Sequence, residues 1–135
     1  MKRTVIALVD DLFWRTKIDH AVQSAGATTT FISDPAALVS VDPERTPLIL
    51  VDLSLKQPPF EGIAALKKLD KAGKIPVVGY YEHVRKDLRD KAVAAGCDVV
   101  LSRSSFSERF ADILMKYALP GGVKTESDET ELPEE

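Results

Sequence analysis

Short apolar runs alternate with helix-like patterns along most of this chain, and the alternation limits the fold more than any other feature. Five segments are short and mostly apolar or β-branched, as expected of strands buried in a sheet: residues 4–9, 28–32, 48–53, 75–80 and 98–101. Apolar residues at helical spacing, or the helix-start signal Asp34-Pro35, follow each of them. The order βαβαβαβαβα predicts an α/β fold with helices on both faces of a parallel sheet.

One domain and a tail account for the length of the chain. The chain has 135 residues, and domains typically contain roughly 100–150 residues. Residues 120–135 hold six acidic residues against one lysine, a net charge of −5, whereas the whole chain carries −3. We therefore expect a domain at residues 1–119 and a disordered acidic tail at residues 120–135. This composition favours a solubilising role for the tail over a partner-binding one.

The cellular location follows from cysteine content and from the N-terminus. Cys97 is the only cysteine, so neither an internal disulfide nor a zinc cluster can form, and a reducing compartment is expected. The first apolar run reaches Asp10 too early for a signal peptide. No stretch approaches the roughly 20 apolar residues that span a bilayer. Basic residues are interleaved with acidic ones, which is not the pattern of a nucleic-acid-binding surface. From these features together we expect a cytoplasmic protein that binds neither membrane nor nucleic acid.

Three aspartates stand at the ends of predicted strands. Asp10 and Asp11 follow the first strand, and Asp52 ends the third. Open α/β sheets bind ligands beyond the carboxyl ends of their strands, where the strand order reverses. If the first and third strands are neighbours, the carboxylates converge and need a cation such as Mg²⁺, which takes one or two carboxylates and often a phosphate oxygen. A carboxylate beside Mg²⁺ can attack phosphorus. The alternative, that these acids only cap helices, is favoured for one aspartate but not for all three.

With these residues the sequence resembles the receiver domains of two-component response regulators, over about residues 3–119. The match rests on Val9-Asp10-Asp11, Asp52, Glu61-Gly62, Ile75-Pro76-Val77-Val78 and Ala94-Ala95-Gly96-Cys97-Asp98. The resemblance implies a flavodoxin-like (βα)5 three-layer sandwich, as in the chemotaxis response regulator, with five parallel strands in the order 2-1-3-4-5. It also implies that Asp10, Asp11 and Asp52 bind Mg²⁺ and that Asp52 is the phosphoacceptor.

The half of the site that reads phosphate departs from the family pattern. Tyr81 stands where the family has the Ser or Thr whose hydroxyl reaches the phosphoryl group, and Val100 replaces the switch aromatic. Arg103 stands where the family has a lysine, and a planar guanidinium is not interchangeable with a compact ammonium. Ser104 replaces the proline that follows this lysine in a cis peptide bond. These changes resemble atypical or pseudo-receiver domains. One hypothesis is that Arg103 pairs directly with Asp52 and mimics a neutralised state.

The predicted function is a stand-alone signalling module rather than an enzyme. It would act by protein–protein interaction in a two-component or related phosphorelay pathway, with phosphorylation at Asp52 possible but impaired. Its partner would be a histidine kinase, a phosphotransfer protein or a downstream effector, and a homodimer is also open. A Mg²⁺-dependent phosphotransfer or hydrolase enzyme is an alternative, although the chain lacks a Gly-rich phosphate loop. A small-ligand or nucleotide-binding domain is another, without a GxGxxG fingerprint.

Aromatic and capping residues complete the expectations. Trp14 lies on the apolar stripe of the first helix and is expected in the core. Of Tyr80 and Tyr81, one is expected in the core and the other at the surface, where it would anchor a protein interface. Ser105 and Glu108 have the spacing of a capping box, which predicts that the last helix begins after Ser105.

Overall fold

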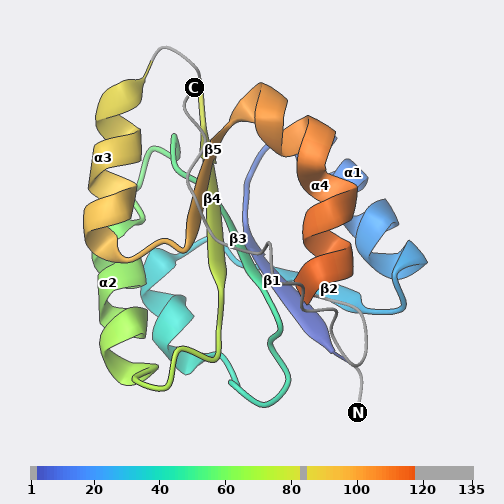
Figure 1. The fold of residues 1–135 in the computed structure, drawn as a ribbon, viewed down its shortest axis with the longest axis horizontal. Helices are drawn as coiled ribbons and strands as arrows, with labels where there is room; N and C mark the ends of the chain where they lie inside the picture. The colour runs from blue at the N-terminus through green and yellow to red at the C-terminus, as the bar shows by residue number, and fades with distance from the viewer. Residues whose placement is uncertain (1–2, 83–84, 118–135) are drawn as a thin grey trace.

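The computed structural model describes residues 3–82 and 85–117, and it confirms the predicted alternation of strands and helices (Figure 1). The strands are β1 (Thr4–Leu8), β2 (Thr28–Phe31), β3 (Ile49–Asp52), β4 (Val77–Tyr81) and β5 (Val99–Ser102). The helices are α1 (Leu12–Ser24), the 3-10 helix η1 (Pro35–Ser40), α2 (Phe60–Leu69), α3 (Lys86–Ala95) and α4 (Arg103–Tyr117). The predicted tail, residues 120–135, lies outside the described residues.

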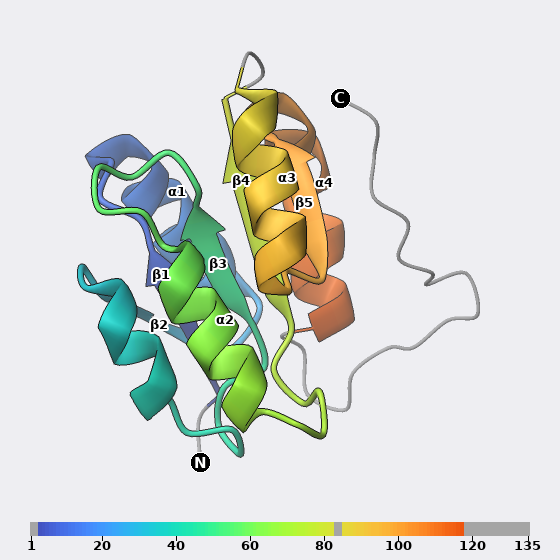
Figure 2. The same cartoon turned by 90° about the vertical axis from the view of Figure 1, so that its left-hand side faces the viewer.

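The strands form one parallel sheet in the order β2-β1-β3-β4-β5, which confirms the flavodoxin-like order predicted from the sequence. Helices α1 and α4 cover one face, and η1, α2 and α3 cover the other (Figures 1 and 2). The chain leaves β1 toward β2 at one side of the sheet and then returns to β3 on the other side of β1. The strand order therefore reverses between β1 and β3, whose carboxyl ends form the expected place for a ligand.

The core consists of two layers of side chains, one on each face of the sheet. Residues alternate between these layers along each strand, because successive side chains of a strand point to opposite faces. In β4, Val78 and Tyr80 pack under α1 and α4, while Val77 and Tyr81 pack under α2 and α3. Both tyrosines are fully buried. The expectation that one of them is exposed as an interface anchor is therefore wrong, because β4 is an inner strand covered on both faces.

The start of α4 differs from the predicted capping box. The helix begins at Arg103, directly after β5, and the backbone N–H of Ser105 donates to Oγ of Ser102 over 3.2 Å. Ser102 is thus the capping residue, three positions before the predicted one, because no loop separates β5 from α4. Ser104 lies in the first turn, with its Oγ 3.3 Å from that of Ser102. Residues 3–82 and 85–117 contain no cis peptide bond.

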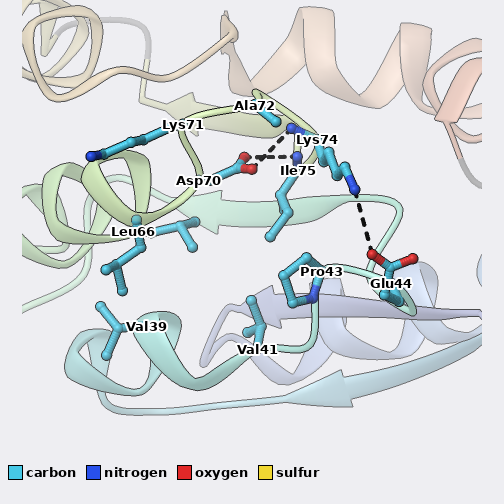
Figure 3. A pocket seen from close by; sticks show the side chains of 11 residues that line it. Val39, Val41, Pro43, Glu44, Leu66, Asp70, Lys71, Ala72, Lys74 and Ile75 are labelled. Atoms are coloured by element: carbon cyan, nitrogen blue, oxygen red, sulfur yellow. Dashed lines mark hydrogen bonds and ion pairs between the residues drawn. The ribbon is translucent and has the colours of Figure 1, made fainter.

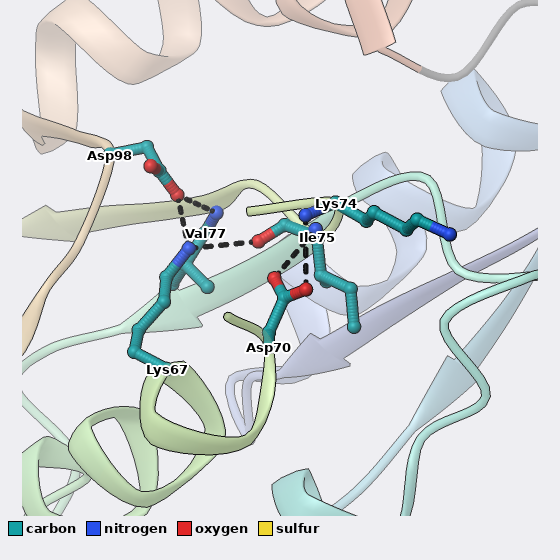
Figure 4. A network of polar contacts seen from close by, with 6 residues as sticks. All are labelled: Lys67, Asp70, Lys74, Ile75, Val77 and Asp98. Atoms are coloured by element: carbon teal, nitrogen blue, oxygen red, sulfur yellow. Dashed lines mark hydrogen bonds and ion pairs between the residues drawn. The ribbon is translucent and has the colours of Figure 1, made fainter. Parts of the chain in front are cut away.

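A polar network fastens the amino-terminal edge of the sheet (Figure 4). Nζ of Lys67, in α2, donates to the carbonyl of Ile75 over 2.9 Å and to Oδ2 of Asp98 over 2.7 Å. The same carboxylate oxygen accepts the backbone N–H of Val77 over 2.7 Å. Asp70 accepts the backbone N–H groups of Lys74 and Ile75. These contacts hold the end of α2 against the starts of β4 and β5. The charged side chains of Lys67, Asp70 and Asp98 therefore have a structural role.

None of the helices in the described part of the chain combines the length and the apolar character that a bilayer crossing requires.

Candidate functional site

Asp52 is a buried acid at the carboxyl edge of the sheet. It ends β3 and is only 6% exposed, whereas most charged residues of the chain lie at the surface. Its Oδ1 accepts the backbone N–H of Ser54 over 2.9 Å, which fixes one carboxylate oxygen at the start of the following loop. Leu50, two residues earlier, packs in the layer under α1 and α4. Strand alternation therefore places Asp52 at this same face of the sheet.

The acid pair stands at the end of the neighbouring strand. Asp10 and Asp11 follow β1 and are both exposed. Asp11 caps α1, because its Oδ1 accepts the backbone N–H of Trp14 over 3.2 Å. Asp10 lines a hollow of about 200 Å³ together with Ile32 and Lys56. Since β1 and β3 are adjacent and parallel, both acids lie at the edge of the sheet where β3 ends with Asp52. Helix capping thus explains Asp11 in part, but Asp10 caps no helix.

The pKa of Asp52 is raised above its ordinary value. Burial is the main cause, and the negative charges of Asp10 and Asp11 act in the same direction. The backbone hydrogen bond from Ser54 and the positive charge of Arg103 lower the pKa and offset part of this rise. The charges of Asp10, Asp11 and Arg103 therefore all act on the carboxylate of Asp52.

This raised pKa gives the folded state a cost that depends on pH. Between the ordinary carboxyl pKa and the raised one, the folded chain binds more protons at Asp52 than the unfolded chain does, so stability falls as pH rises through that window. Asp52→Asn removes the buried charge and keeps an oxygen for the Ser54 N–H. We expect the variant to have a higher urea midpoint than the wild type at pH 7, with a difference that shrinks as the pH falls from the raised pKa of Asp52 toward the ordinary value of about 3.9.

The control for this prediction is Asp10→Asn, which removes an exposed carboxylate from the same edge and should shift stability by less than about 0.5 kcal/mol. Urea unfolding of the three proteins at several pH values checks the result. An Asp52→Asn protein that is no more stable than the wild type at pH 7 would contradict the account of the buried carboxylate.

The donor set of this edge suits a hard cation with a largely open coordination shell. Carboxylate oxygens are the ligands that Mg²⁺ prefers, and Mg²⁺ commonly retains several waters beside one or two carboxylates. Within the described ranges, no three or more His, Cys, Asp or Glu side chains form a group that could hold a metal ion, so Asp10, Asp11 and Asp52 do not form the predicted three-acid group in this structure. Asp10 and Asp11 flank the edge from β1, and the oxygen of Asp52 approaches it from β3. These residues fit Mg²⁺ held in part by water, and they do not fit a metal that needs a closed protein shell.

Arg103 pairs with a different acid from the expected one. Its Nη1 lies 4.0 Å from Oε2 of Glu82, the exposed residue that follows β4. The predicted ion pair between Arg103 and Asp52 is therefore wrong for this structure. The physical reason is the parallel pairing of β4 with β5, which sets Glu82 beside the first turn of α4. Nε of Arg103 is buried and has no hydrogen-bond partner among the described residues, so the guanidinium keeps an unused donor.

The sequence pattern alone does not reveal where the side chains of the other two switch positions, Tyr81 and Ser104, lie. Tyr81 packs in the layer under α2 and α3, together with Val100, on the face of the sheet opposite Asp52. Ser104 is exposed in the first turn of α4. The resemblance therefore identifies the correct strand ends, but Tyr81 does not contribute its side chain to the face where Asp52 lies.

Tyr80 is the site residue that sequence reasoning missed. It pairs with Asp52 in the parallel register of β3 and β4, so the two side chains are neighbours on one face of the sheet. Its ring stacks on Phe106 at 4.5 Å between centroids and lies 5.6 Å from the ring of Trp14. Burial, and then the negative charge of Asp52, raise the pKa of its hydroxyl. The two-residue period of strands, counted across the predicted β3–β4 pair, was the signal that could have identified it.

Another hollow, of about 320 Å³, lies away from the acid site. It opens between the ends of η1 and α2, where Val39, Leu66 and Ile75 form apolar walls (Figure 3). Glu44 and Lys74 pair across its rim at 3.4 Å. These residues belong to the loops that precede β3 and β4, at the amino-terminal edge of the sheet. The hollow is therefore at the opposite end of the strands from Asp52.

Comparisons with known proteins support the fold. No protein-family model matches the sequence, and no curated protein matches it. Among solved structures, the chain is similar to the phosphorylated cyanobacterial phytochrome response regulator RcpA, with a TM-score of 0.70, 19% identity, and coverage of 87% of this chain and 94% of that one. The chemotaxis protein CheY4 of Vibrio cholerae gives a TM-score of 0.69 at 19% identity, covering 87% of this chain and 99% of that one.

A third similar structure bears on the metal. It is the receiver domain of a sensor histidine kinase from Pseudomonas aeruginosa, solved with a magnesium ion coordinated in its active-site cleft. Its TM-score is 0.69 at 18% identity, with coverage of 87% of this chain and 98% of that one. At such identities the likeness establishes the fold: this chain has the architecture of response-regulator receiver domains.

Proposed function

We propose that this chain is a receiver-type signalling module in a two-component or related phosphorelay pathway, in which Asp52 accepts a phosphoryl group. The observation that carries the proposal is the burial of Asp52 at the carboxyl end of β3, next to the strand β1 that the acid pair follows. A carboxylate at a strand-order reversal, flanked by two further acids, is suited to phosphoryl transfer with Mg²⁺. The phosphorylated and the magnesium-bound neighbours add support from the same fold.

In this proposal each acid has its own part. One carboxylate oxygen of Asp52 stays on the Ser54 N–H, and the other attacks phosphorus. The new O–P bond makes an acyl phosphate, while the bond from phosphorus to the donor's leaving atom breaks and that atom keeps the electron pair. The leaving atom is an imidazole nitrogen when the donor is a phosphohistidine and an oxygen when it is acetyl phosphate. Asp10 and Asp11, with Asp52, would hold Mg²⁺, which offsets the charge of the phosphoryl oxygens. The cation would also relieve the repulsion among the three carboxylates.

Phosphorylation in this module is proposed to be impaired, in the manner of an atypical receiver. Arg103 is engaged with Glu82, so this acid competes with a phosphoryl group for the guanidinium. Tyr81 lies on the other face of the sheet and offers no hydroxyl at the usual place. A hydrogen bond to a charged group contributes about 1.5–3 kcal/mol. Without such bonds, the phosphoryl group would be held weakly.

Output would come from the surface of the domain and from a protein partner, rather than from enzymatic turnover. Leu12 and Phe13, directly after the acid pair, are 77% and 65% exposed. Apolar side chains beside a site whose charge changes suit a protein surface that responds to phosphorylation. We propose a histidine kinase, a phosphotransfer protein or a downstream effector as the partner, and the cytoplasm as the location. A homodimer stays a prediction.

A titration with beryllofluoride, a phosphoryl mimic, tests this function. Trp14 serves as the fluorescent reporter because its ring contacts Tyr80 and its backbone N–H donates to Oδ1 of Asp11. We expect a Mg²⁺-dependent change in Trp14 emission in the wild type and none in Asp52→Asn. Absence of an Asp52-dependent signal, by fluorescence and by fluorine NMR, would count against the receiver function. Hydrolysis of a small phosphorylated molecule that survives in Asp52→Asn would favour the enzyme alternative instead.

A further inference from the structure

We propose that the hydroxyl of Tyr80 is a hydrogen-bond donor to the phosphoryl group carried by Asp52. It would supply from β4 the hydroxyl that Tyr81 cannot offer, and would make Tyr80 a positioning residue of the phosphorylated state. The ligand is a tetrahedral or trigonal phosphoryl-type anion attached to the carboxylate. This inference rests on the proposed function and assigns one further residue to the same site.

Tyr80 lies beside Asp52 in the sheet. Asp52 and Tyr80 are register partners in the parallel pair β3–β4, and both belong to the face covered by α1 and α4. Tyr81, the next residue, belongs to the opposite layer. Of the two tyrosines, only Tyr80 therefore shares a face of the sheet with the phosphoacceptor. The charges that act on Asp52, those of Asp10, Asp11 and Arg103, also act on the Tyr80 hydroxyl.

The hydroxyl of Tyr80 is a buried polar group. Tyr80 is 0% exposed, and its hydroxyl oxygen has no hydrogen-bond partner among the described residues. Buried polar groups in folded proteins nearly always have a partner, and an orphan requires an explanation. An apolar residue of similar shape would fill the same aromatic cluster without this penalty. A donor buried next to Asp52 is explained if a group that joins Asp52 later accepts its hydrogen bond.

A phosphoryl group is larger than the carboxylate that carries it. The Asp52 carboxylate has one oxygen on the Ser54 N–H and makes no hydrogen bond with Tyr80 in this structure. A phosphoryl group extends the side chain and adds three strong acceptor oxygens. It thereby reaches beyond the carboxylate into the space around the acid. The hydroxyl of Tyr80, Oγ of Ser54 and Nε of Arg103 are buried groups near this position that have no hydrogen-bond partner among the described residues. Of these three, the Tyr80 hydroxyl is the one that β4 supplies on the face of Asp52.

The ring of Tyr80 packs against aromatic residues of α1 and α4. Tyr80 stacks on Phe106, at an interplanar angle of 18°, and Trp14 contacts both rings. A new hydrogen bond at the Tyr80 hydroxyl would thus be felt by residues of α1 and α4, whose first turns flank the site. The emission of Trp14 reports this contact, independently of any turnover.

The test compares Tyr80→Phe with Tyr81→Phe, because each removes one buried hydroxyl and keeps its ring, on opposite faces of β4. The ligand is beryllofluoride with Mg²⁺, and binding is followed by fluorine NMR and by Trp14 emission. We expect Tyr80→Phe to weaken binding about tenfold, equivalent to about 1.4 kcal/mol, and to shift a bound fluorine resonance. Tyr81→Phe should stay within about twofold of the wild type, less than the loss expected of one hydrogen bond to a charged group.

A second measurement uses no ligand. If the Tyr80 hydroxyl lacks a partner in the unmodified protein, Tyr80→Phe should leave the urea midpoint unchanged or raise it. A clear fall in the midpoint would show that the hydroxyl already has a partner, and would overturn the inference. Equal beryllofluoride affinities for Tyr80→Phe and Tyr81→Phe would overturn it as well, while leaving the proposed function intact. A wild-type protein that binds no beryllofluoride at Asp52 would overturn both.

Discussion

Replacement of Phe106 by alanine is expected to lower the free energy of unfolding by about 3–5 kcal/mol. Phe106 is 0% exposed in the first turns of α4, and its ring contacts those of Tyr80, Trp14 and Phe110 at 4.5–5.6 Å between centroids. Alanine would leave a cavity where four aromatic rings meet, and such rings relax poorly into a void. Because domains are stable by only about 5–15 kcal/mol in total, the variant should approach the limit of folding.

Met115→Ala is the matched control on the same helix. Met115 is 54% exposed, so its truncation should change stability by less than about 0.5 kcal/mol. Urea unfolding, followed by Trp14 emission and by circular dichroism, measures both variants. The account of the core would be contradicted if Phe106→Ala lost no more stability than Met115→Ala.

A second large effect is expected at Gly62, where α2 approaches η1 closely. A Cβ at this position would lie 2.5 Å from the backbone carbonyl oxygen of Pro35 and 3.1 Å from its Cβ. Helix propensity alone would make alanine more favourable than glycine by about 1 kcal/mol. The contact with a backbone atom reverses that sign, because the helix and η1 must move apart. We expect Gly62→Ala to destabilise the domain by about 1–3 kcal/mol.

Urea unfolding measures whether Gly62→Ala lowers or raises the stability of the domain, and the sign of the change tests the close packing of α2 against η1. A Gly62→Ala protein that is more stable than the wild type would mean that η1 and α2 are not packed as described. The effect concerns the site as well, because α2 follows the loop that begins at Asp52 and η1 follows β2.

The fold and the place of the site were predictable because each rests on a short-range pattern. Apolar runs separated by helical spacing define the order of elements, and the crossover rule then leaves a parallel sheet. Asp10, Asp11 and Asp52 stand at strand ends in the sequence itself. Once β1 and β3 are neighbours, their convergence follows from the topology alone.

The side of the sheet was harder to predict than its order. A strand buried on both faces carries apolar residues at every position, so the pattern of β4 does not reveal which tyrosine faces α1 and which faces α3. The phase is set by the pairing with β3, in which Asp52 meets Tyr80. For this reason the sequence led to Tyr81, and the residue beside the acid is Tyr80.

The contacts of long side chains and of capping side chains could not be predicted from the sequence for a different reason. Arg103 has several acids within its reach, and only the packing of β4 against β5 selects Glu82. The start of α4 depends on the absence of a loop after β5, which turns Ser102 rather than Ser105 into the cap. Both outcomes depend on tertiary geometry that no local spacing encodes.

The most direct test of the central claim is the reaction of the protein with acetyl phosphate and Mg²⁺, read by intact mass and peptide mapping beside Asp52→Asn. The proposal predicts a partial phosphoryl adduct on the peptide that contains Asp52, dependent on Mg²⁺ and absent from the variant. An adduct that persists in Asp52→Asn, or no adduct on Asp52 at any donor concentration, would contradict the claim that this buried aspartate is a phosphoacceptor.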